Sequence, residues 1–497
     1  MNKIKKIANN LITPGGTLSQ RVVKSGFWVF FLRIFNQGFG LLRLIILARI
    51  LSPKDFGLMG IAVLTISILE TFSETGFQEA LIQKKEDIKS YLDNVWTFLI
   101  LRGFLLFVIL YFIAPYAAVF FNTPEAKPII RVIGFSILFE AFTNIGVTYF
   151  KKELEFNKEF LYQLTGTLAD FIVAISTVLI LRNVWALVLG LLAGNITRCF
   201  VSYLIHPYRP RLNFALEKVK ELFGFGKWIF GSSILVFLIT HGDDILVGKL
   251  LGTTALGFYQ LAYRISNMPA TEITHVISQV TFPAYSKLQD NIPKLREAYL
   301  KVLQVTAFLS FPIAGLIFVL APDFTKIFLG EKWLPMVPAM QVLVWWGVIR
   351  GLVGSMSPIF LSLGKPKVVT KMQFFQSVLL ILFIYPLIMH WDILGASFAV
   401  LLSALIMFFI RNNILIKVIN SKIVEFYKPI FIPIILTVFS IFPIIYLKAL
   451  IIESINIYYF IFFIIIFILF FIFFNYITKR FFNYSIKILL KENLKLL

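Results

Sequence analysis

The feature that most limits the fold of this chain is a succession of apolar runs about 20 residues long, the length a helix needs to cross roughly 30 Å of hydrocarbon. Such runs follow one another along most of the 497 residues, 59% of which are hydrophobic. Helices suit this setting because they bond their own backbone amides without water. The sequence therefore predicts an all-α, polytopic membrane protein with about fourteen transmembrane helices.

An internal repeat divides the chain. The stretch from Trp28 to Gly60 returns later at one constant offset, with Trp28 matched by Trp228 and Gly57 matched by Gly257. The run Ala48-Arg49-Ile50-Leu51 is matched by Gly248-Lys249-Leu250-Leu251 at the same offset. Because repeats of this kind build many transporters, we expect two pseudo-symmetric lobes of six helices each, followed by two further helices.

The connections between the runs predict four segments. Residues 1–207 form the N-terminal lobe, 208–226 a cytoplasmic amphipathic linker, 227–416 the C-terminal lobe, and 417–497 the last two spans with a cytoplasmic tail. The linker is expected to be helical because its apolar residues recur at helical spacing. The last two spans are nearly pure Ile and Phe, so we expect them to face lipid.

The net charge of +21 reflects membrane topology and not nucleic-acid binding. Lys and Arg gather in alternate connections, including the first residues and the tail, while the opposite connections carry few. Cytoplasmic loops are enriched in Lys and Arg, so we expect both termini in the cytoplasm. The single cysteine, Cys199, lies within a span, and the chain has no nucleotide-binding or metalloprotease motif. We therefore expect no enzyme activity, no metal and no ATP-driven transport.

The basic residues inside the predicted spans are all arginines. They are Arg33, Arg43, Arg102, Arg131, Arg198, Arg264 and Arg350. A guanidinium stays charged in low dielectric and grips phosphate or carboxylate through two parallel hydrogen bonds, so this set predicts an anionic ligand. The alternative is that arginines pair with glutamates of neighbouring spans and only hold helices together, and Arg131 is near enough to a span end to reach the interface.

Acidic residues inside the spans are candidates for coupling transport to an ion. The spans contain Glu70, Glu74, Glu140, Asp170, Asp243, Asp244 and Glu272, of which the candidates are Asp243, Asp244, Glu70, Glu74 and Glu272. One of the two adjacent aspartates, together with His241, is suited to bind a proton or Na⁺, because intramembrane carboxylates commonly form such sites. No other cofactor is expected.

Two short segments at the ends of spans resemble a known family. Leu47–Leu58 (LARILSPKDFGL) is similar to the signature after the first span of bacterial polysaccharide transporters, which are flippases of undecaprenyl-pyrophosphate-linked repeat units. Phe282–Asp290 (FPAYSKLQD) is similar to the same family's signature after the eighth span, with most likeness to the colanic-acid exporter group. The resemblance covers about residues 20–420 and identifies the scaffold, not the substrate.

The resemblance implies a fold and a mechanism. It implies two six-helix lobes around a cationic cavity, as in multidrug extruders of the MATE type and the lipid II flippase MurJ, with alternating access driven by an ion gradient or membrane potential. The resemblance also implies that arginines hold the substrate pyrophosphate: Arg33 and Arg264 first, then Arg43, Arg102, Arg350 and Arg198. Asn36, Gln37, Trp345 and Trp346 are expected to contact sugars, although tryptophans more often serve packing.

Three functions remain open from sequence alone. The first is a flippase for lipid-linked oligosaccharides of O-antigen, capsule or exopolysaccharide biosynthesis. Such a flippase could also bind a polysaccharide polymerase and chain-length proteins. The second is a cation-coupled extruder of drugs or metabolites, which the many arginines disfavour because its typical cargo is cationic. The third, a membrane glycosyltransferase or polymerase, would need longer outward loops than this sequence has.

Overall fold

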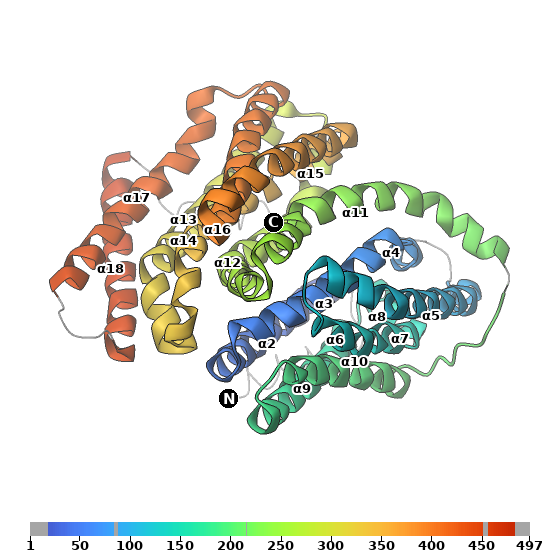
Figure 1. Cartoon of the computed structure of the whole chain (residues 1–497). Helices are drawn as coiled ribbons and strands as arrows, with labels where there is room; N and C mark the ends of the chain where they lie inside the picture. The colour runs from blue at the N-terminus through green and yellow to red at the C-terminus, as the bar shows by residue number, and fades with distance from the viewer. Residues whose placement is uncertain (1–17, 84–87, 215, 451–455, 483–497) are drawn as a thin grey trace, which may run out of the picture. The chain divides into compact units, whose positions relative to one another are not determined.

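The computed structural model describes residues 18–83, 88–214, 216–450 and 456–482, and every regular element in these ranges is a helix (Figure 1). Contacts divide the chain into two units. Unit 1 comprises Met1–Phe237 and Gly252–Thr254, and unit 2 comprises Leu238–Leu251 and Ala255–Leu497. The predicted all-helical fold is confirmed. The change from one unit to the other falls inside helix α11 (Leu216–Leu251), and the predicted lobe boundaries stay predictions.

Unit 1 is built from long helices and one broken span. Its elements before α11 are α2 (Leu18–Ile50), α3 (Pro53–Phe72), α4 (Phe77–Gln83), α5 (Lys89–Phe120), α6 (Ala126–Ile133), α7 (Phe135–Ala141), the 3₁₀ turn η1 (Ile145–Val147), α8 (Thr148–Lys152), α9 (Phe156–Leu181) and α10 (Trp185–Ile205). The chain bends by 67° between Ala126–Ala141 and Ile145–Lys152. At the bend, the Asn144 side chain accepts a hydrogen bond from the amide of Gly146, at 2.9 Å, and so starts a new turn.

Glycines bring α9 and α10 close together. A Cβ added at Gly190 would lie 2.6 Å from the Cβ of Ala174, and one at Gly194 would lie 3.0 Å from the carbonyl oxygen of Gly166. Small residues let the backbones of membrane helices approach, and the contact area they gain replaces the hydrophobic driving force that lipid does not provide. These two helices therefore form a tightly packed pair within unit 1.

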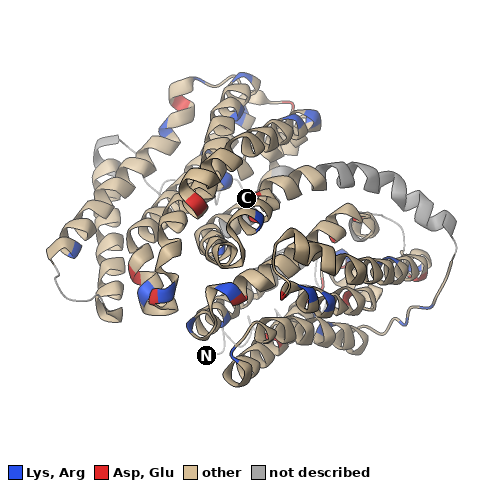
Figure 2. Ribbon diagram, in the orientation of Figure 1, with Lys and Arg blue, Asp and Glu red and all other residues tan. Residues whose placement is uncertain are grey.

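Unit 2 carries the second half of the chain. After α11 it contains α12 (Thr253–Leu288), α13 (Ile292–Phe324), the π-helical turn η2 (Thr325–Leu329), the 3₁₀ turn η3 (Glu331–Met336), α14 (Val337–Gly354), α15 (Ser357–Ser362), α16 (Pro366–Val418), α17 (Ile423–Leu450) and α18 (Ile457–Phe482). An ion pair between Lys448 and Asp323 ties α17 to α13. The long helices are uncharged over most of their length (Figure 2).

Helix α16 is two helices joined by a sharp bend. Trp391 and Asp392 have non-helical backbone angles, and Asp392 has a φ of 49°. A Cβ at Gly395 would lie 1.9 Å from the carbonyl oxygen of Leu387, so only glycine permits this close a return of the chain. The break falls between the two spans that the sequence predicts here.

The described residues contain ten helices that are long and apolar enough to cross a membrane, or eleven if the bent pair in unit 1 counts as one span. Division of α16 at Trp391 and Asp392 adds another crossing. Helix α18 has a mean hydropathy of 3.1, and only 11% of its most apolar stretch is buried, as expected for a helix in contact with lipid. The chain is a multi-pass membrane protein.

The first residues of the predicted linker are extended and not helical. Pro207 and Pro210 lack amide hydrogens, and each disfavours a helical residue before it. Tyr208 instead donates its hydroxyl to Asp93 at 2.6 Å, and the amide of Arg211 donates to the same carboxylate at 2.9 Å. The expectation of a helix from the start of the linker is thus wrong for residues 208–214. The helix begins at Leu216 and continues as α11, whose first side chains lie outside the described residues.

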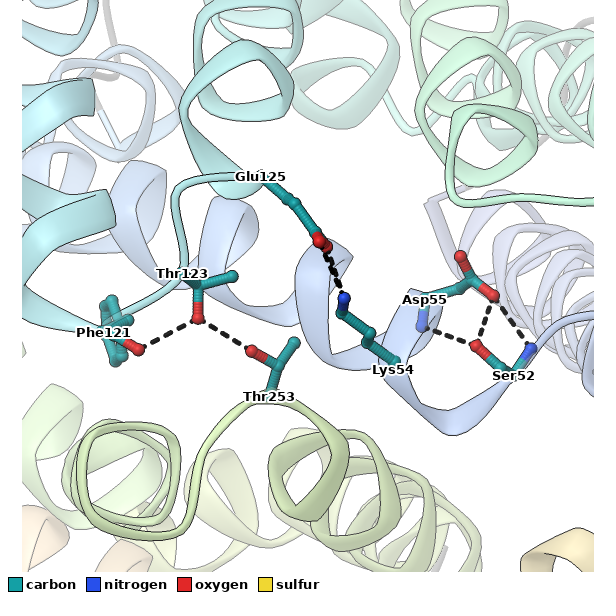
Figure 3. Close-up of polar contacts among 7 residues, drawn as sticks. All are labelled: Ser52, Lys54, Asp55, Phe121, Thr123, Glu125 and Thr253. Atoms are coloured by element: carbon teal, nitrogen blue, oxygen red, sulfur yellow. Dashed lines mark hydrogen bonds and ion pairs between the residues drawn. The ribbon is translucent and has the colours of Figure 1, made fainter.

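The two turns related by the internal repeat belong to unit 1 and pack against each other. Helices α3 and α12 begin at Pro53 and Thr253, the matching positions of the repeat. Ser52 and Asp55 form a capping box at the start of α3, with 2.9 Å between the Ser52 amide and the Asp55 carboxylate (Figure 3). A Cβ at Gly57 would lie only 1.8 Å from the carbonyl oxygen of Thr253. The glycine at position 57 thus has a steric reason.

Side chains reinforce this contact. The hydroxyls of Thr123 and Thr253 are 2.9 Å apart, and Thr123 also lies 2.9 Å from the carbonyl oxygen of Phe121 (Figure 3). Lys54 forms an exposed ion pair with Glu125 at 2.7 Å. The loop between α5 and α6 and the turn before α12 are therefore fixed to the start of α3.

Candidate functional site

Arg43 lies on α2 and pairs with an acidic residue of α9. Its Nη2 atom is 2.9 Å from Oδ1 of Asp170, and the two side chains are 17% and 25% exposed. The sequence suggested pairing between the first two spans, whereas this partner comes from the fifth. Nearby, Oδ1 of Asn36 accepts a hydrogen bond from Thr167 at 2.9 Å, so a second polar contact joins the same two helices. Arg43 thus has a structural partner, and its predicted contact with pyrophosphate stays a prediction.

Arg102 of α5 binds the carboxyl-terminal end of α3. Its Nε donates to the carbonyl oxygen of Ser73 at 2.9 Å, and its Nη2 donates to the hydroxyl of Ser73 at 2.8 Å and to the carbonyl oxygen of Glu70 at 3.3 Å. The last carbonyls of a helix lack intrahelical partners and carry partial negative charge, so a guanidinium stabilises them. The side chains of Glu70 and Glu74 also interact electrostatically with Arg102. The structure brings these three predicted residues together.

A cavity of about 250 Å³ lies within unit 1 among α4, the bent span, α9 and α10, and we call it the polar pocket. Its polar lining consists of Glu140, Thr143, Thr148, Lys151, Glu159, Tyr162, Gln163, Asn195 and Arg198. Glu159 is 6% exposed and accepts a hydrogen bond from Gln163 at 3.0 Å, while Arg198 donates to Asn195. Arg198, one of the arginines predicted to bind substrate, thus lines this cavity.

The adjacent aspartates of α11 form a buried cluster in unit 2. Asp243 has no exposed surface, and its Oδ2 accepts a hydrogen bond from the hydroxyl of Tyr259 at 2.6 Å. Oδ2 of Asp244 lies 3.5 Å from Nδ1 of His241. The Oδ1 atom of each aspartate is buried without a hydrogen-bond partner among the described residues. Buried carboxylate oxygens left in this state are suited to take up a proton or a small cation.

The two tryptophans of α14 pack inside unit 2. Trp346 is 3% exposed, its ring centroid is 5.0 Å from that of Tyr263, and the guanidinium of Arg350 lies 5.5 Å from its ring centroid. Trp345 stacks at a tilt against Phe318, with centroids 5.8 Å apart. Trp346 therefore serves packing in this structure, which was the alternative to sugar contact, and the sugar contact of both residues stays a prediction.

The pair with the strongest predicted role is divided between the units. Arg33 is a half-buried residue of α2 in unit 1, as is Gln37, and Arg264 is an exposed residue of α12 in unit 2. The pyrophosphate clamp formed by the two arginines stays a prediction. Glu272 also lies in α12, but its side chain is outside the described residues.

Some residues of these sites were missed at the sequence level. Glu159, Gln163 and Asn195 line the polar pocket with Arg198. Asp170 was recognised as an acidic residue inside a span, but its pairing with Arg43 was not predicted. Glu159 and Gln163 are four residues apart on α9, a spacing that places both on one helix face. A polar stripe along an otherwise apolar span was therefore the available signal. This signal was weak because the other residues that line the pocket are not adjacent to Glu159 and Gln163 in the sequence.

The sequence matches one protein family over more than half its length. Residues 46–338 match the family model described as polysaccharide biosynthesis protein. The lipopolysaccharide biosynthesis protein WzxC of Escherichia coli (strain K12) is 26% identical over 73% of this chain and 75% of its own length. The teichuronic acid biosynthesis protein TuaB of Bacillus subtilis (strain 168) is 26% identical over 73% of this chain and 76% of its own length.

Solved structures share the fold at low identity. The lipid II flippase MurJ, in an inward closed conformation, has a TM-score of 0.75 at 17% identity and covers 93% of this chain and 100% of its own. An inward-facing multidrug transporter of the MATE family has a TM-score of 0.59 at 18% identity, over 78% of this chain and 95% of its own. The predicted MATE- and MurJ-like architecture is therefore confirmed.

The sequence resemblance and the fold agree. The match covers both repeat-related turns, which the structure places together in unit 1, and the fold is MurJ- and MATE-like. The chain belongs to the polysaccharide biosynthesis protein family, a family of transporters and not of enzymes.

Proposed function

We propose that this protein is a flippase that moves undecaprenyl-pyrophosphate-linked oligosaccharide repeat units across the bacterial inner membrane by alternating access. The observation that carries the proposal is the set of arginines and polar side chains inside membrane-spanning helices of a polysaccharide biosynthesis protein. A polyprenyl pyrophosphate bears negative charge and sugar hydroxyls, which hydrocarbon alone would exclude. Guanidinium groups supply the positive charge that such a head group needs within the bilayer.

The proposal includes the destination of the cargo and the orientation of the protein. Relatives named for lipopolysaccharide, teichuronic acid and succinoglycan biosynthesis indicate that related chains serve different glycans. We therefore assign this chain to O-antigen, capsule or exopolysaccharide biosynthesis, with both termini in the cytoplasm. Direct binding to a polysaccharide polymerase or chain-length protein is part of the same proposal.

The buried aspartates of α11 support coupling to an ion gradient. Uptake of H⁺ or Na⁺ by the cluster of Asp243 and Asp244 would satisfy the two oxygens that lack partners. An ion bound more tightly in one conformation than in the other shifts the balance between inward and outward access. Glu70, Glu74 and Glu272 are further coupling candidates, of which Glu70 and Glu74 lie beside Arg102.

Transport in proteoliposomes tests the proposal. The cargo is undecaprenyl-pyrophosphate oligosaccharide extracted from the source strain, and its appearance in the opposite leaflet is measured under defined Na⁺ and pH gradients. We expect Arg33→Ala and Arg264→Ala to reduce transport at least tenfold, about the loss expected for one charge-assisted hydrogen bond to a phosphate. Arg131→Ala is the matched control, because Arg131 stacks on Tyr111 at 4.1 Å at an exposed position.

The outcomes separate flipping from other functions. Undiminished transport by both variants would make these arginines structural. If the wild type moves no lipid-linked glycan but expels organic cations, the chain is a multidrug or metabolite extruder, an activity that the shared MATE fold permits.

A further inference from the structure

The polar pocket of unit 1 contains more charge than its internal contacts explain. Glu140, Lys151, Glu159 and Arg198 all line the cavity. Of the four, Glu140 and Lys151 are exposed, Arg198 is half-buried and Glu159 is buried, with 6% of its surface exposed. Within the described part of the chain, no ion pair joins Glu159 or Arg198 to another charged group. Charges inside a membrane protein are costly and normally pair with one another or face a ligand. The polar pocket therefore has the character of a ligand site.

The pocket is held in shape by the helices around it. A Cβ at Gly166 of α9 would lie 2.5 Å from Cγ of Arg198. The glycine therefore leaves space for the aliphatic part of the Arg198 side chain. Asn195 fixes the guanidinium one turn away on α10, and Gln163 fixes the carboxylate of Glu159 on α9. Both charged groups are thus positioned by neighbouring amides, and each charged group keeps hydrogen-bonding capacity that these amides do not use.

The lining defines the class of ligand. Two carboxylates and two cations give no net charge, so the cavity favours neither a phosphate nor a simple cation. Carboxylates accept hydrogen bonds, guanidinium and ammonium groups donate them, and the amides of Gln163 and Asn195 do both. Hydroxyl groups also donate and accept, so a sugar ring satisfies this mixture better than an ion does. The volume of about 250 Å³ is below the roughly 300–1,000 Å³ of sites for drug-sized ligands, which limits the occupant to about one ring.

We propose that the polar pocket binds a single sugar residue of the transported lipid-linked oligosaccharide, with Glu159 and Arg198 as its two main contacts. This inference rests on the proposed flippase function and assigns the glycan, not the pyrophosphate, to Arg198. The site adds a glycan contact within unit 1 that is separate from the predicted clamp of Arg33 and Arg264. Recognition of one ring would let the protein select among glycans that share the same lipid carrier.

The experiment compares two probes on the full-length chain in lipid nanodiscs. The first is the soluble oligosaccharide released from the extracted lipid by mild acid, and the second is undecaprenyl pyrophosphate without sugar. Glu159→Gln and Arg198→Gln are the test variants: the first keeps the shape of the side chain and removes its charge, and the second replaces the guanidinium by a shorter, neutral amide. The matched control is Glu155→Gln, because Glu155 lies just before α9 and pairs with Lys158 at 2.8 Å, outside the pocket.

We expect the wild type and the control to bind the soluble oligosaccharide, and both test variants to lose about tenfold or more in affinity, as for one lost hydrogen bond to a charged group. Binding of undecaprenyl pyrophosphate should stay unchanged. Equal affinity of all four proteins for the oligosaccharide, or no binding by a wild type that flips the lipid, would overturn the sugar site and leave the flippase function standing. Parallel loss for the sugar-free lipid would assign Arg198 to pyrophosphate instead.

Folding of the variants is measured separately. Thermal unfolding temperatures within a few degrees of the wild type show that a loss of affinity is local, and Asn195→Ala offers a milder change in the same pocket. We expect this variant to weaken sugar binding less than Arg198→Gln does, since it removes a residue that positions the guanidinium. Failure of the wild type to flip any lipid-linked glycan, together with retained sugar binding, would reject the flippase and keep the sugar site.

Discussion

Arg43 and Asp170 show how a single ion pair can fix two membrane helices. Their charged atoms are 2.9 Å apart, and both side chains are mostly buried. We expect Asp170→Asn to lower the free energy of unfolding by on the order of 1–3 kcal/mol, because it leaves the guanidinium without its carboxylate, although partial exposure reduces the effect. Thermal unfolding in detergent measures the change. The double variant Arg43→Gln with Asp170→Asn should recover part of the loss, and strictly additive losses would contradict the coupling.

At the buried aspartates, the test is the ion dependence of transport. Asp243→Asn removes the charge that Tyr259 contacts at 2.6 Å, so we expect the variant to lose the response of transport to the coupling Na⁺ or pH gradient. Initial rates are measured at a series of gradients. Asp392→Asn is the matched control, because Asp392 is exposed in the bend of α16. A normal gradient response in Asp243→Asn would exclude the cluster as the coupling site.

His206 makes the stability of the extended segment sensitive to pH. Burial, followed by the charges of Lys158 and Arg209, lowers the pKa of His206 below its ordinary value of 6.5. Its Nδ1 accepts a hydrogen bond from the amide of Tyr208 at 3.1 Å, and the ring stacks on Tyr149. The neutral form is therefore the one that the folded protein prefers. Burial, with the hydrogen bond to Asp93, also raises the pKa of Tyr208, so its hydroxyl remains a donor.

The sign of the pH effect follows from that lowered pKa. The unfolded chain takes up a proton first, so stability is full above about pH 6.5 and falls as the pH drops through the folded-state pKa of His206. We expect a loss of about 1 kcal/mol or less, because the ring is partly exposed. Hydrogen exchange of residues 206–214 between pH 7.5 and 5 measures it. His206→Asn should flatten the pH dependence, and an unchanged slope would show that another group is responsible.

At the scale of elements, the contact between α3 and the turn before α12 tolerates no side chain at Gly57. An added Cβ would lie 1.8 Å from the carbonyl oxygen of Thr253, so the backbone has to move. We expect Gly57→Ala to lower the free energy of unfolding by about 1–3 kcal/mol. Gly38→Ala is the control, since no atom lies within 4 Å of its added Cβ and alanine favours the helix. Equal stability of the two variants would contradict this packing.

Long elements were predictable, and the breaks within them were not. Apolar length marks α5, α9, α10 and α18 directly, because a span in lipid has few alternatives to a helix. The bend near Asn144 depends on a side chain that caps a new turn, and its neighbours are contributed by distant residues such as Ser202 and Tyr208. Pro207 and Pro210 were a local signal for the extended start of the linker. The prediction gave more weight to the helical spacing of the apolar residues.

At the scale of the whole molecule, the family and the membrane-spanning fold could be predicted from the sequence, whereas the partners of each charge could not. Every intramembrane base is an arginine, and this property needs no structure. Whether an arginine binds a carboxylate, a helix end or a cavity depends on tertiary contacts, as the different surroundings of Arg43, Arg102 and Arg198 demonstrate. The sequence therefore predicted which charged residues lie within the spans but not how they are arranged.

The discontinuous composition of unit 1 has a consequence for its synthesis. All its residues up to Phe237 are contiguous, but Gly252–Thr254 reaches the unit only after the rest of α11 has been made. Until then, the surface formed by Gly57 and Thr123 lacks the segment that covers it. When the sixth span has just been synthesised, unit 1 therefore enters the bilayer without one of its segments. The turn of the second repeat supplies that segment and completes the unit that contains the first repeat.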